Sequence, residues 1–195
     1  MSSALQPALA ALAAGQIVVL TGDRLRGGDI DFAMAARHAD AAAINFMATH
    51  GRGLICLALT PAQAVRLGIG LINPGAARQS GRPHGRSIEA REGVSTGISA
   101  ADRARTIAVA MAPRASADDL VSPGHVFPLI AAPGGIAERP AALEAAIELT
   151  RRAGAGEAAV ICSIMRDDGE MARIDDIAEL IAQHGLAVVD LSELA

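Results

Sequence analysis

One polar, glycine-rich loop has the residue types needed for chemistry. The loop is Gly22-Asp23-Arg24-Leu25-Arg26-Gly27-Gly28-Asp29, and it follows the apolar run Gly15–Leu20, which is typical of a buried strand. Polar loops at strand ends are where α/β proteins usually hold ligands and catalytic groups. Carboxylates in such a loop can transfer protons, and arginines can hold an anion. The Ala- and Met-rich segment after Asp29 predicts a helix.

The elements that must position this loop alternate along the chain. Periodicity and turn residues predict helices at 3–14, 40–50, 99–111, 140–153 and 174–184, and strands at 17–20, 52–59, 158–165 and 187–190. A short helix should begin after Thr60-Pro61, and proline confines Val126–Leu129 to a sheet edge or to irregular structure. Residues 72–86 are rich in glycine, proline and arginine, which predicts a mobile loop. We expect one compact three-layer domain over residues 1–195.

Composition argues against several classes of protein. Of the 195 residues, 51% are hydrophobic but only 2% are aromatic, so the core must be built from aliphatic side chains. A net charge of −4 and the lack of stacking aromatics argue against a nucleic-acid partner. No apolar run reaches about 18 residues and no basic leader is present, so we expect a cytoplasmic protein with no membrane partner. Cys56 and Cys162 lie in apolar runs, which predicts buried, reduced thiols.

Five segments of the chain, taken together, resemble one known family. They are, in chain order, Asp23–Asp29, His50–Cys56, Glu92–Arg103, Pro123–Leu129 and Asp167–Arg173. In this order they are similar to the motifs of 3,4-dihydroxy-2-butanone 4-phosphate synthase, an enzyme family of riboflavin biosynthesis. The resemblance spans nearly the whole chain. It implies an α+β fold, a three-layer α/β/α domain with a mixed, twisted sheet, and a homodimer with active sites near the subunit boundary.

The reaction of that family sets the chemistry to look for. Its members convert ribulose 5-phosphate to formate and a four-carbon phosphorylated ketone. The reaction removes a proton next to a carbonyl group, rearranges the carbon skeleton and releases one carbon. Enediolate-like intermediates need a divalent cation on neighbouring oxygens and groups that transfer protons. The resemblance therefore implies Mg²⁺, which prefers hard oxygen ligands, as the family's cofactor.

Part of the family's site is retained. Arg24 and Asp29 match the first family motif, Asp-Arg-Glu-Asn-Glu-Gly-Asp, and are expected to touch the substrate. Arg139 and Glu144 match the motif Arg-x-Gly-His-Thr-Glu, and His125 matches a family residue required for activity. We predict that the catalytic residues are His125 and Asp29, and that the substrate-binding residues are Arg24, Arg139, Asp29 and Arg26.

The positions that hold the metal in the family have changed. The metal-binding glutamate falls on Leu25 and the metal-binding histidine on Ala142, and neither side chain has a lone pair. A second glutamate falls on Gly27, and the glutamate after the late-strand cysteine falls on Ser163. We therefore expect no metal and no other cofactor, and a family activity that is lost or changed. Arg26 is new relative to the family and could place a guanidinium where the charge of the cation would lie.

Each of these residues also has a simpler structural interpretation. His125 could hydrogen-bond backbone in a turn, Asp29 could cap the predicted helix that follows it, and the arginines could be solvated surface residues. Asp102 and Arg103 are expected to form a structural ion pair near the cleft. His50 and His84 stay open between a structural or exposed position and a role at the site.

Three functions stay open for a small anionic ligand or substrate. The first is a diverged enzyme that binds or transforms a sugar-phosphate-like or keto compound by metal-independent acid–base chemistry. The second is a catalytically inactive homologue that binds a ligand or a partner subunit. The third is an active riboflavin-pathway lyase with rerouted metal ligands such as Asp23, Asp29 and Glu144. The changes at both metal positions favour the first.

Overall fold

A mixed β-sheet forms the centre of the protein. The computed structural model describes residues 5–72 and 82–194. Across the sheet the strands follow the order β4-β5-β3-β6-β2-β1-β7. They are β1 (Val18–Asp23), β2 (Asp29–Ala35), β3 (Arg52–Leu59), β4 (Ile88–Ala90), β5 (Leu120–Ile130), β6 (Ala159–Ile164) and β7 (Ala187–Asp190). β1 is parallel to β7 and β3 is parallel to β5, and the other neighbours are antiparallel. The expected mixed sheet is confirmed.

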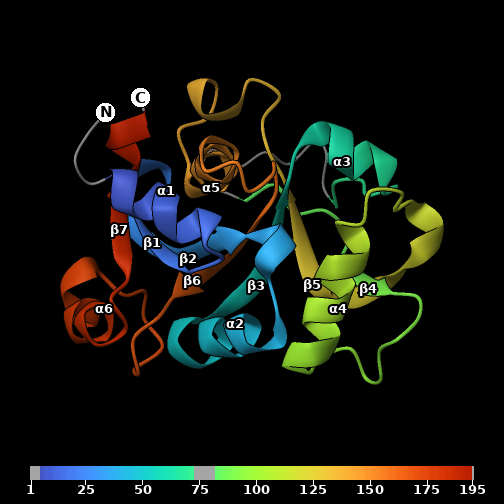
Figure 1. Ribbon diagram of the computed structural model, residues 1–195, viewed down its shortest axis with the longest axis horizontal. Helices are drawn as coiled ribbons and strands as arrows, with labels where there is room; N and C mark the ends of the chain where they lie inside the picture. The colour runs from blue at the N-terminus through green and yellow to red at the C-terminus, as the bar shows by residue number, and fades with distance from the viewer. Residues whose placement is uncertain (1–4, 73–81, 195) are drawn as a thin grey trace.

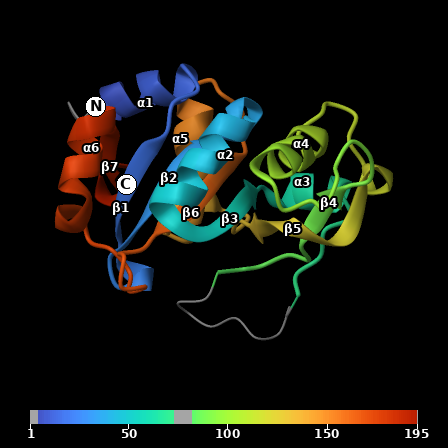
Figure 2. The same cartoon turned by 90° about the horizontal axis from the view of Figure 1, so that it is seen from below.

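Helices cover both faces of this sheet, which confirms the three layers. On one face lie α1 (Leu5–Ala13) and α5 (Ala142–Arg152). On the other face lie α2 (Ala41–Phe46), α3 (Pro61–Arg66), α4 (Ala100–Ala110) and α6 (Ala178–His184). In both views β7, α1 and α6 lie at one end of the molecule, and α3, α4 and β4 lie at the other (Figure 1 and Figure 2). No helix in the described ranges is long and apolar enough to span a bilayer.

The segment after the polar loop is a strand, so the prediction of a helix there is wrong. β2 lies between β1 and β6 and is buried from Ile30 onward. Phe32 and Met34 belong to one core cluster while Ala33 belongs to the other. Successive side chains of β2 therefore point to opposite faces of the sheet, as in any strand. Because both faces are covered, a run rich in Ala and Met can also form such a strand. Asp29 therefore begins a strand and caps no helix.

Proline lies inside β5, contrary to the prediction for this segment. β5 is second from the edge of the sheet, and Pro128 pairs with Leu57 of β3. On the opposite side, Ile130 donates its N–H to the Pro83 carbonyl at 3.1 Å, and Gly85 donates to the Pro128 carbonyl at 2.9 Å. The nitrogen of Pro128 thus faces residues 83–85, beyond the end of β4. Because this nitrogen points away from β3, the lack of an N–H at Pro128 costs no hydrogen bond to β3, and β5 continues through the proline.

The other predicted helices and strands are confirmed, with ends shifted by a few residues. Thr60 begins α3 with a capping box that includes Gln63, as the Thr-Pro pair predicts. Ser99 caps α4 by accepting the Asp102 N–H at 3.0 Å. Of the predicted loop 72–86, residues 73–81 lie outside the described residues, so its mobility stays a prediction.

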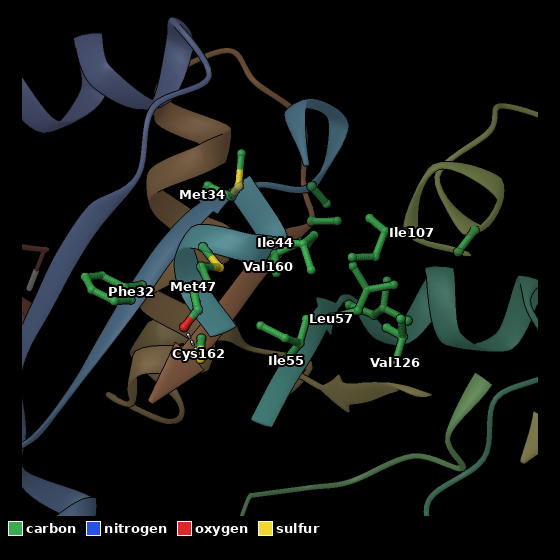
Figure 3. Close-up of a cluster of buried hydrophobic side chains, with 14 of the residues drawn as sticks. Phe32, Met34, Ile44, Met47, Ile55, Leu57, Ile107, Val126, Val160 and Cys162 are labelled. Carbon is green, nitrogen blue, oxygen red and sulfur yellow. Dashed lines mark hydrogen bonds between the residues drawn. The ribbon is translucent and has the colours of Figure 1, made fainter. Parts of the chain in front are cut away.

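The core is aliphatic, and both cysteines are inside it. Figure 3 shows Cys162 among Phe32, Met47 and Ile55, with its thiol donating to the Met47 carbonyl at 3.6 Å. Cys56 and Cys162 are free and buried, which confirms the expected thiols. Burial raises the pKa of Cys56 to about 11 and that of Cys162 to about 12. Neither thiol can form much thiolate at neutral pH.

We expect both thiols to be nearly inert in the native protein. Because only the thiolate attacks a disulfide reagent, native protein at pH about 8 should react at least ~100-fold more slowly than an exposed cysteine. The measurement is colour development with Ellman's reagent, before and after unfolding in guanidinium chloride. The unfolded chain should release two equivalents at once. Rapid reaction of the native protein would show that the packing around Cys56 or Cys162 opens in solution.

Candidate active site

Arg26 lies among the carboxylates of the polar loop and of β2. One 3-10 turn, Arg24–Arg26, follows β1 and leads through two glycines into β2. Arg26 Nη1 is 2.6 Å from Asp31 Oδ2, and its Nη2 is 3.1 Å from Asp29 Oδ2. The same Nη1 is 4.0 Å from Asp23 Oδ2. The structure thus brings the predicted residues Arg26 and Asp29 together as an ion pair.

Asp31 is the anchor of this cluster, although the sequence analysis did not single it out. It is fully buried in β2, where its carboxylate pairs with both Arg26 and Arg82. Ser163, its direct neighbour on β6, donates its hydroxyl to Asp31 Oδ1 at 2.9 Å. Burial alone would raise the pKa of Asp31, but the Arg82 and Arg26 guanidinium groups outweigh it and hold this pKa below its usual value. Asp31 therefore stays ionised between two arginines.

A second group of charges joins the polar loop to the start of α5. Asp23 is buried, and its Oδ2 accepts the backbone N–H of Ala142 at 3.0 Å. Glu144, in the first turn of α5, accepts the Ala132 N–H at 3.0 Å and lies 3.9 Å from Arg139 Nη1. Burial raises the pKa of Glu144 above its usual value. The Asp23 carboxylate thus acts as a tertiary cap for α5, and it fixes the loop against this helix.

The two arginines expected to clamp an anion lie on the two segments that Asp23 joins. Arg24 follows Asp23 directly and is exposed. Arg139 precedes α5 and has a largely buried side chain beside Glu144. Asp29 pairs with two arginines. Its Oδ2 contacts Arg26, and its Oδ1 lies 3.0 Å from Nη1 of the exposed Arg173.

His125 lies elsewhere on the sheet and has a partner of its own. Its Nδ1 is 2.9 Å from Glu89 Oε2, and its backbone N–H donates to the same oxygen at 3.0 Å. Glu89 is buried on β4, whereas the His125 side chain is 42% exposed. β5 is separated from β2 by β3 and β6, which places the two strands about 14 Å apart. The structure therefore does not bring His125 into the Arg26 cluster of the same chain.

Several single-residue expectations are settled by the described contacts. The predicted Asp102–Arg103 ion pair is wrong, because Asp102 accepts hydrogen bonds from Ser95 and Gly97 and makes no ion pair with Arg103 among the described residues. His50 packs against Phe46 with the two rings tilted by 47° and their centroids 4.5 Å apart. This contact supports the structural interpretation of His50.

Asp31, Arg82 and Glu89 were not predicted from the sequence. An acidic residue inside the apolar run of β2 is the signal for Asp31, and it was lost when this run was interpreted as a helix. Glu89 lies in a strand of three residues, too short to leave a pattern. Nothing in the local sequence distinguishes Arg82 from its neighbouring arginines.

The residues of the cluster were also compared with what a metal ion requires. In residues 5–72 and 82–194, no three His, Cys, Asp or Glu side chains are placed to hold a metal ion. Leu25 and Ala142 contribute no donor side chain. Asp23, Asp29 and Asp31 contact Arg26, and Glu144 lies 3.9 Å from Arg139. Among the described residues, Asp23 Oδ1 and Glu144 Oε2 are buried without a hydrogen-bond partner.

Comparison with known proteins gives the family. The model of 3,4-dihydroxy-2-butanone 4-phosphate synthase matches residues 6–195. The synthase of Pseudomonas aeruginosa is 45% identical over 180 residues, which cover 92% of this chain and 49% of that protein. The synthase of Ralstonia nicotianae is 41% identical over 195 residues, which cover 100% of this chain and 86% of the relative. The chain spans about half the length of several other curated relatives that it matches.

The fold comparison agrees with the sequence comparison. A solved 3,4-dihydroxy-2-butanone 4-phosphate synthase in complex with two magnesium ions superposes with a TM-score of 0.91 and 32% identity, covering 99% of this chain and 95% of that one. The match of nearly the whole chain in both sequence and fold decides the assignment: the chain belongs to the 3,4-dihydroxy-2-butanone 4-phosphate synthase family.

Proposed function

We propose that this chain is a diverged member of its family that binds or transforms a small anionic carbonyl compound without a divalent cation. The class of ligand is a sugar phosphate or a keto acid. The proposal includes acid–base chemistry by His125, with Asp29 at the ligand, and an anion site that contains Arg24 and Arg139.

The position of Arg26 carries this proposal. Its guanidinium contacts Asp31 at 2.6 Å and Asp29 at 3.1 Å, and it donates to Ser163 Oγ at 3.1 Å. Magnesium requires hard oxygen ligands in near-octahedral order. Here Asp29 and Asp31 already pair with the Arg26 guanidinium, and the matched ligand positions Leu25 and Ala142 have no donor side chain. These residues do not fit Mg²⁺.

The Glu89–His125 pair supports the acid–base part. A histidine whose Nδ1 is held by a carboxylate presents Nε2 to a ligand, and the His125 ring is partly exposed. Nε2 can take the proton from the carbon next to a carbonyl, and the bonding electrons then move to the carbonyl oxygen. A nearby guanidinium stabilises the resulting oxyanion. The step needs no metal, but its guanidinium has to come from a second copy of the chain, because His125 lies apart from the Arg26 cluster within one chain.

The homodimer expected from the resemblance is part of the proposal. Within one chain, β5 with His125 and β2 with Asp29 are separated by two strands. A second copy placed across the subunit boundary could bring its His125 to the arginines of the first. The mass in solution, measured by light scattering, tests whether two copies associate.

Sequence similarity favours one competing function. Identities of 41–45% with proteins named as synthases favour an active lyase that converts ribulose 5-phosphate. The catalytically inactive homologue that binds a ligand or a partner subunit is the third possibility, and turnover that is lost on His125→Ala would rule it out.

We expect the purified protein to release no formate from ribulose 5-phosphate in the presence of Mg²⁺. It should still bind ribulose 5-phosphate or pyruvate in excess EDTA, because arginines rather than a metal hold the anion. Arg24→Gln should weaken that binding by roughly tenfold, since a charge-assisted hydrogen bond contributes about 1.5–3 kcal/mol. Arg37→Gln is the matched control, because this exposed arginine contacts only the Gly154 carbonyl among the described residues. Formate release that stops with EDTA would support the lyase instead.

Restoring the family residues should restore metal binding only when Arg26 is also replaced. Leu25→Glu with Ala142→His supplies two ligands but leaves the Arg26 guanidinium on the carboxylates. Adding Arg26→Asn should tighten Mg²⁺ binding at least ~10-fold over the double variant, because a cation no longer meets a like charge about 4 Å away. Isothermal titration calorimetry gives both affinities. Equal Mg²⁺ affinity in the double and triple variants would contradict the role given to Arg26.

Replacing Arg26 should also destabilise the fold, with a defined pH dependence. Arg26→Met leaves the buried Asp31 with Arg82 alone, so we expect a loss of about 2–3 kcal/mol at neutral pH. Because the folded-state pKa of Asp31 is lowered, this contribution is present above the unfolded value and is lost as the pH falls through the folded value. The difference between variant and wild type should therefore shrink below pH about 4.

Urea denaturation at several pH values measures this effect. Arg173→Met is the control, because Arg173 pairs with Asp29 from an exposed position and should contribute about 0.5 kcal/mol or less. Equal losses in the two variants would show that Arg26 makes no more than a surface ion pair.

A further inference from the structure

We infer that Glu89, Gly97 and Asp102 are positioning residues that hold the His125 ring with Nδ1 protonated and Nε2 free to accept a proton. The use of Nε2 on a ligand rests on the proposed function, whereas the positioning itself rests on contacts of this chain. It also gives a structural role to the segment Glu92–Arg103, since the contacts described for Arg26 involve no residue of this segment.

Glu89 determines which ring nitrogen of His125 carries the hydrogen. One of its oxygens, Oε2, lies 2.9 Å from His125 Nδ1 and 3.0 Å from the His125 backbone nitrogen. A carboxylate oxygen only accepts, so both nitrogens must carry hydrogen. Two bonds to one oxygen fix the ring relative to its own backbone. Since Glu89 is 8% exposed, water competes little for this oxygen.

Gly97 leaves the space in which the Glu89 carboxylate lies. A Cβ at position 97 would be 1.3 Å from Glu89 Oε1 and 2.4 Å from Oε2, so no other residue type fits unless Glu89 moves. The backbone of Gly97 also has a φ of 84°, in the left-handed region that glycine adopts without strain.

Asp102 holds this glycine in place. Its Oδ2 accepts the Gly97 N–H at 3.0 Å and the Ser95 hydroxyl at 2.8 Å, and its Oδ1 accepts the Ser95 N–H at 3.2 Å. Hydrogen bonds from Ser95 and Gly97 hold the pKa of Asp102 below its usual value. Asp102 lies in the first turn of α4, behind the Ser99 cap. A rigid helix therefore fixes the loop, the loop confines the Glu89 carboxylate, and Glu89 orients His125.

The test is the tautomer of His125, observed by ¹⁵N NMR of the full chain at pH about 8.5, where an ordinary histidine is neutral. Wild type should show Nδ1 protonated and Nε2 unprotonated. Glu89→Gln removes the charge but keeps the shape, and it should shift the ring toward the mixture of tautomers seen in free histidine. Gly97→Ala should do the same, because the new methyl group displaces the Glu89 carboxylate.

Gly93→Ala is the matched control for Gly97→Ala. Gly93 has a nearly equal φ of 80°, but the atoms nearest to a Cβ there belong to the flexible Arg105 side chain, with Nε at 3.0 Å and Cζ and Nη2 at 3.5 Å. It should leave the tautomer unchanged. Gly97→Ala should lower Tm by at least ~5 °C more than Gly93→Ala does. Combining Gly97→Ala with Glu89→Ala should remove this additional decrease in Tm, because the displaced carboxylate is then absent.

Two results would overturn the inference: protonation of Nε2 in wild type, or a ring state that Glu89→Gln leaves unchanged. These outcomes are independent of the proposed function. A fixed Nδ1–H ring that responds to both variants, in a protein that binds no ribulose 5-phosphate or pyruvate, would keep the positioning and reject the function.

Discussion

The buried carboxylate of Asp31 constrains the whole polar end of the sheet. It lies on a central strand with no exposed surface. Removing an ionised carboxylate from water costs several kcal/mol unless charges and hydrogen bonds compensate. Arg26, Arg82 and Ser163 supply that compensation. Because Arg26 belongs to the β1–β2 connection, this connection must fold back over β2, and Gly27 and Gly28, with φ of 68° and 82°, allow the tight turn.

The charges of this cluster balance without an added ion. Asp23, Asp29 and Asp31 supply the negative charges, and Arg26, Arg82 and Arg173 supply the positive ones. A divalent cation placed among them would leave two positive charges uncompensated. That is an electrostatic argument for the proposal of metal-independent chemistry.

The sequence was sufficient for most elements because their signals are local. Thr60-Pro61 predicts its helix by capping, and the runs at residues 52–59 and 158–165 predict strands by length and apolarity. β2 was misinterpreted because alanine and methionine suit a helix, and only pairing with β1 and β6 makes it a strand. That single error hid Asp31. Glu89 could not be predicted either, since its role depends on a contact with β5 across a loop and a helix.

A carboxylate on β2, in place of the one expected on β6, changes what that group can do. The resemblance places a glutamate at position 163, where this chain has serine, and the residue paired directly across from it is Asp31. A negative charge is therefore still present at this point of the sheet. However, Asp31 is shorter, fully buried and engaged by two arginines that favour its ionised form. A group held in this way supplies fixed charge and does not exchange protons near neutral pH. The proposed function therefore assigns proton transfer to an exposed group, His125, whose Nδ1 lies 2.9 Å from Glu89 Oε2.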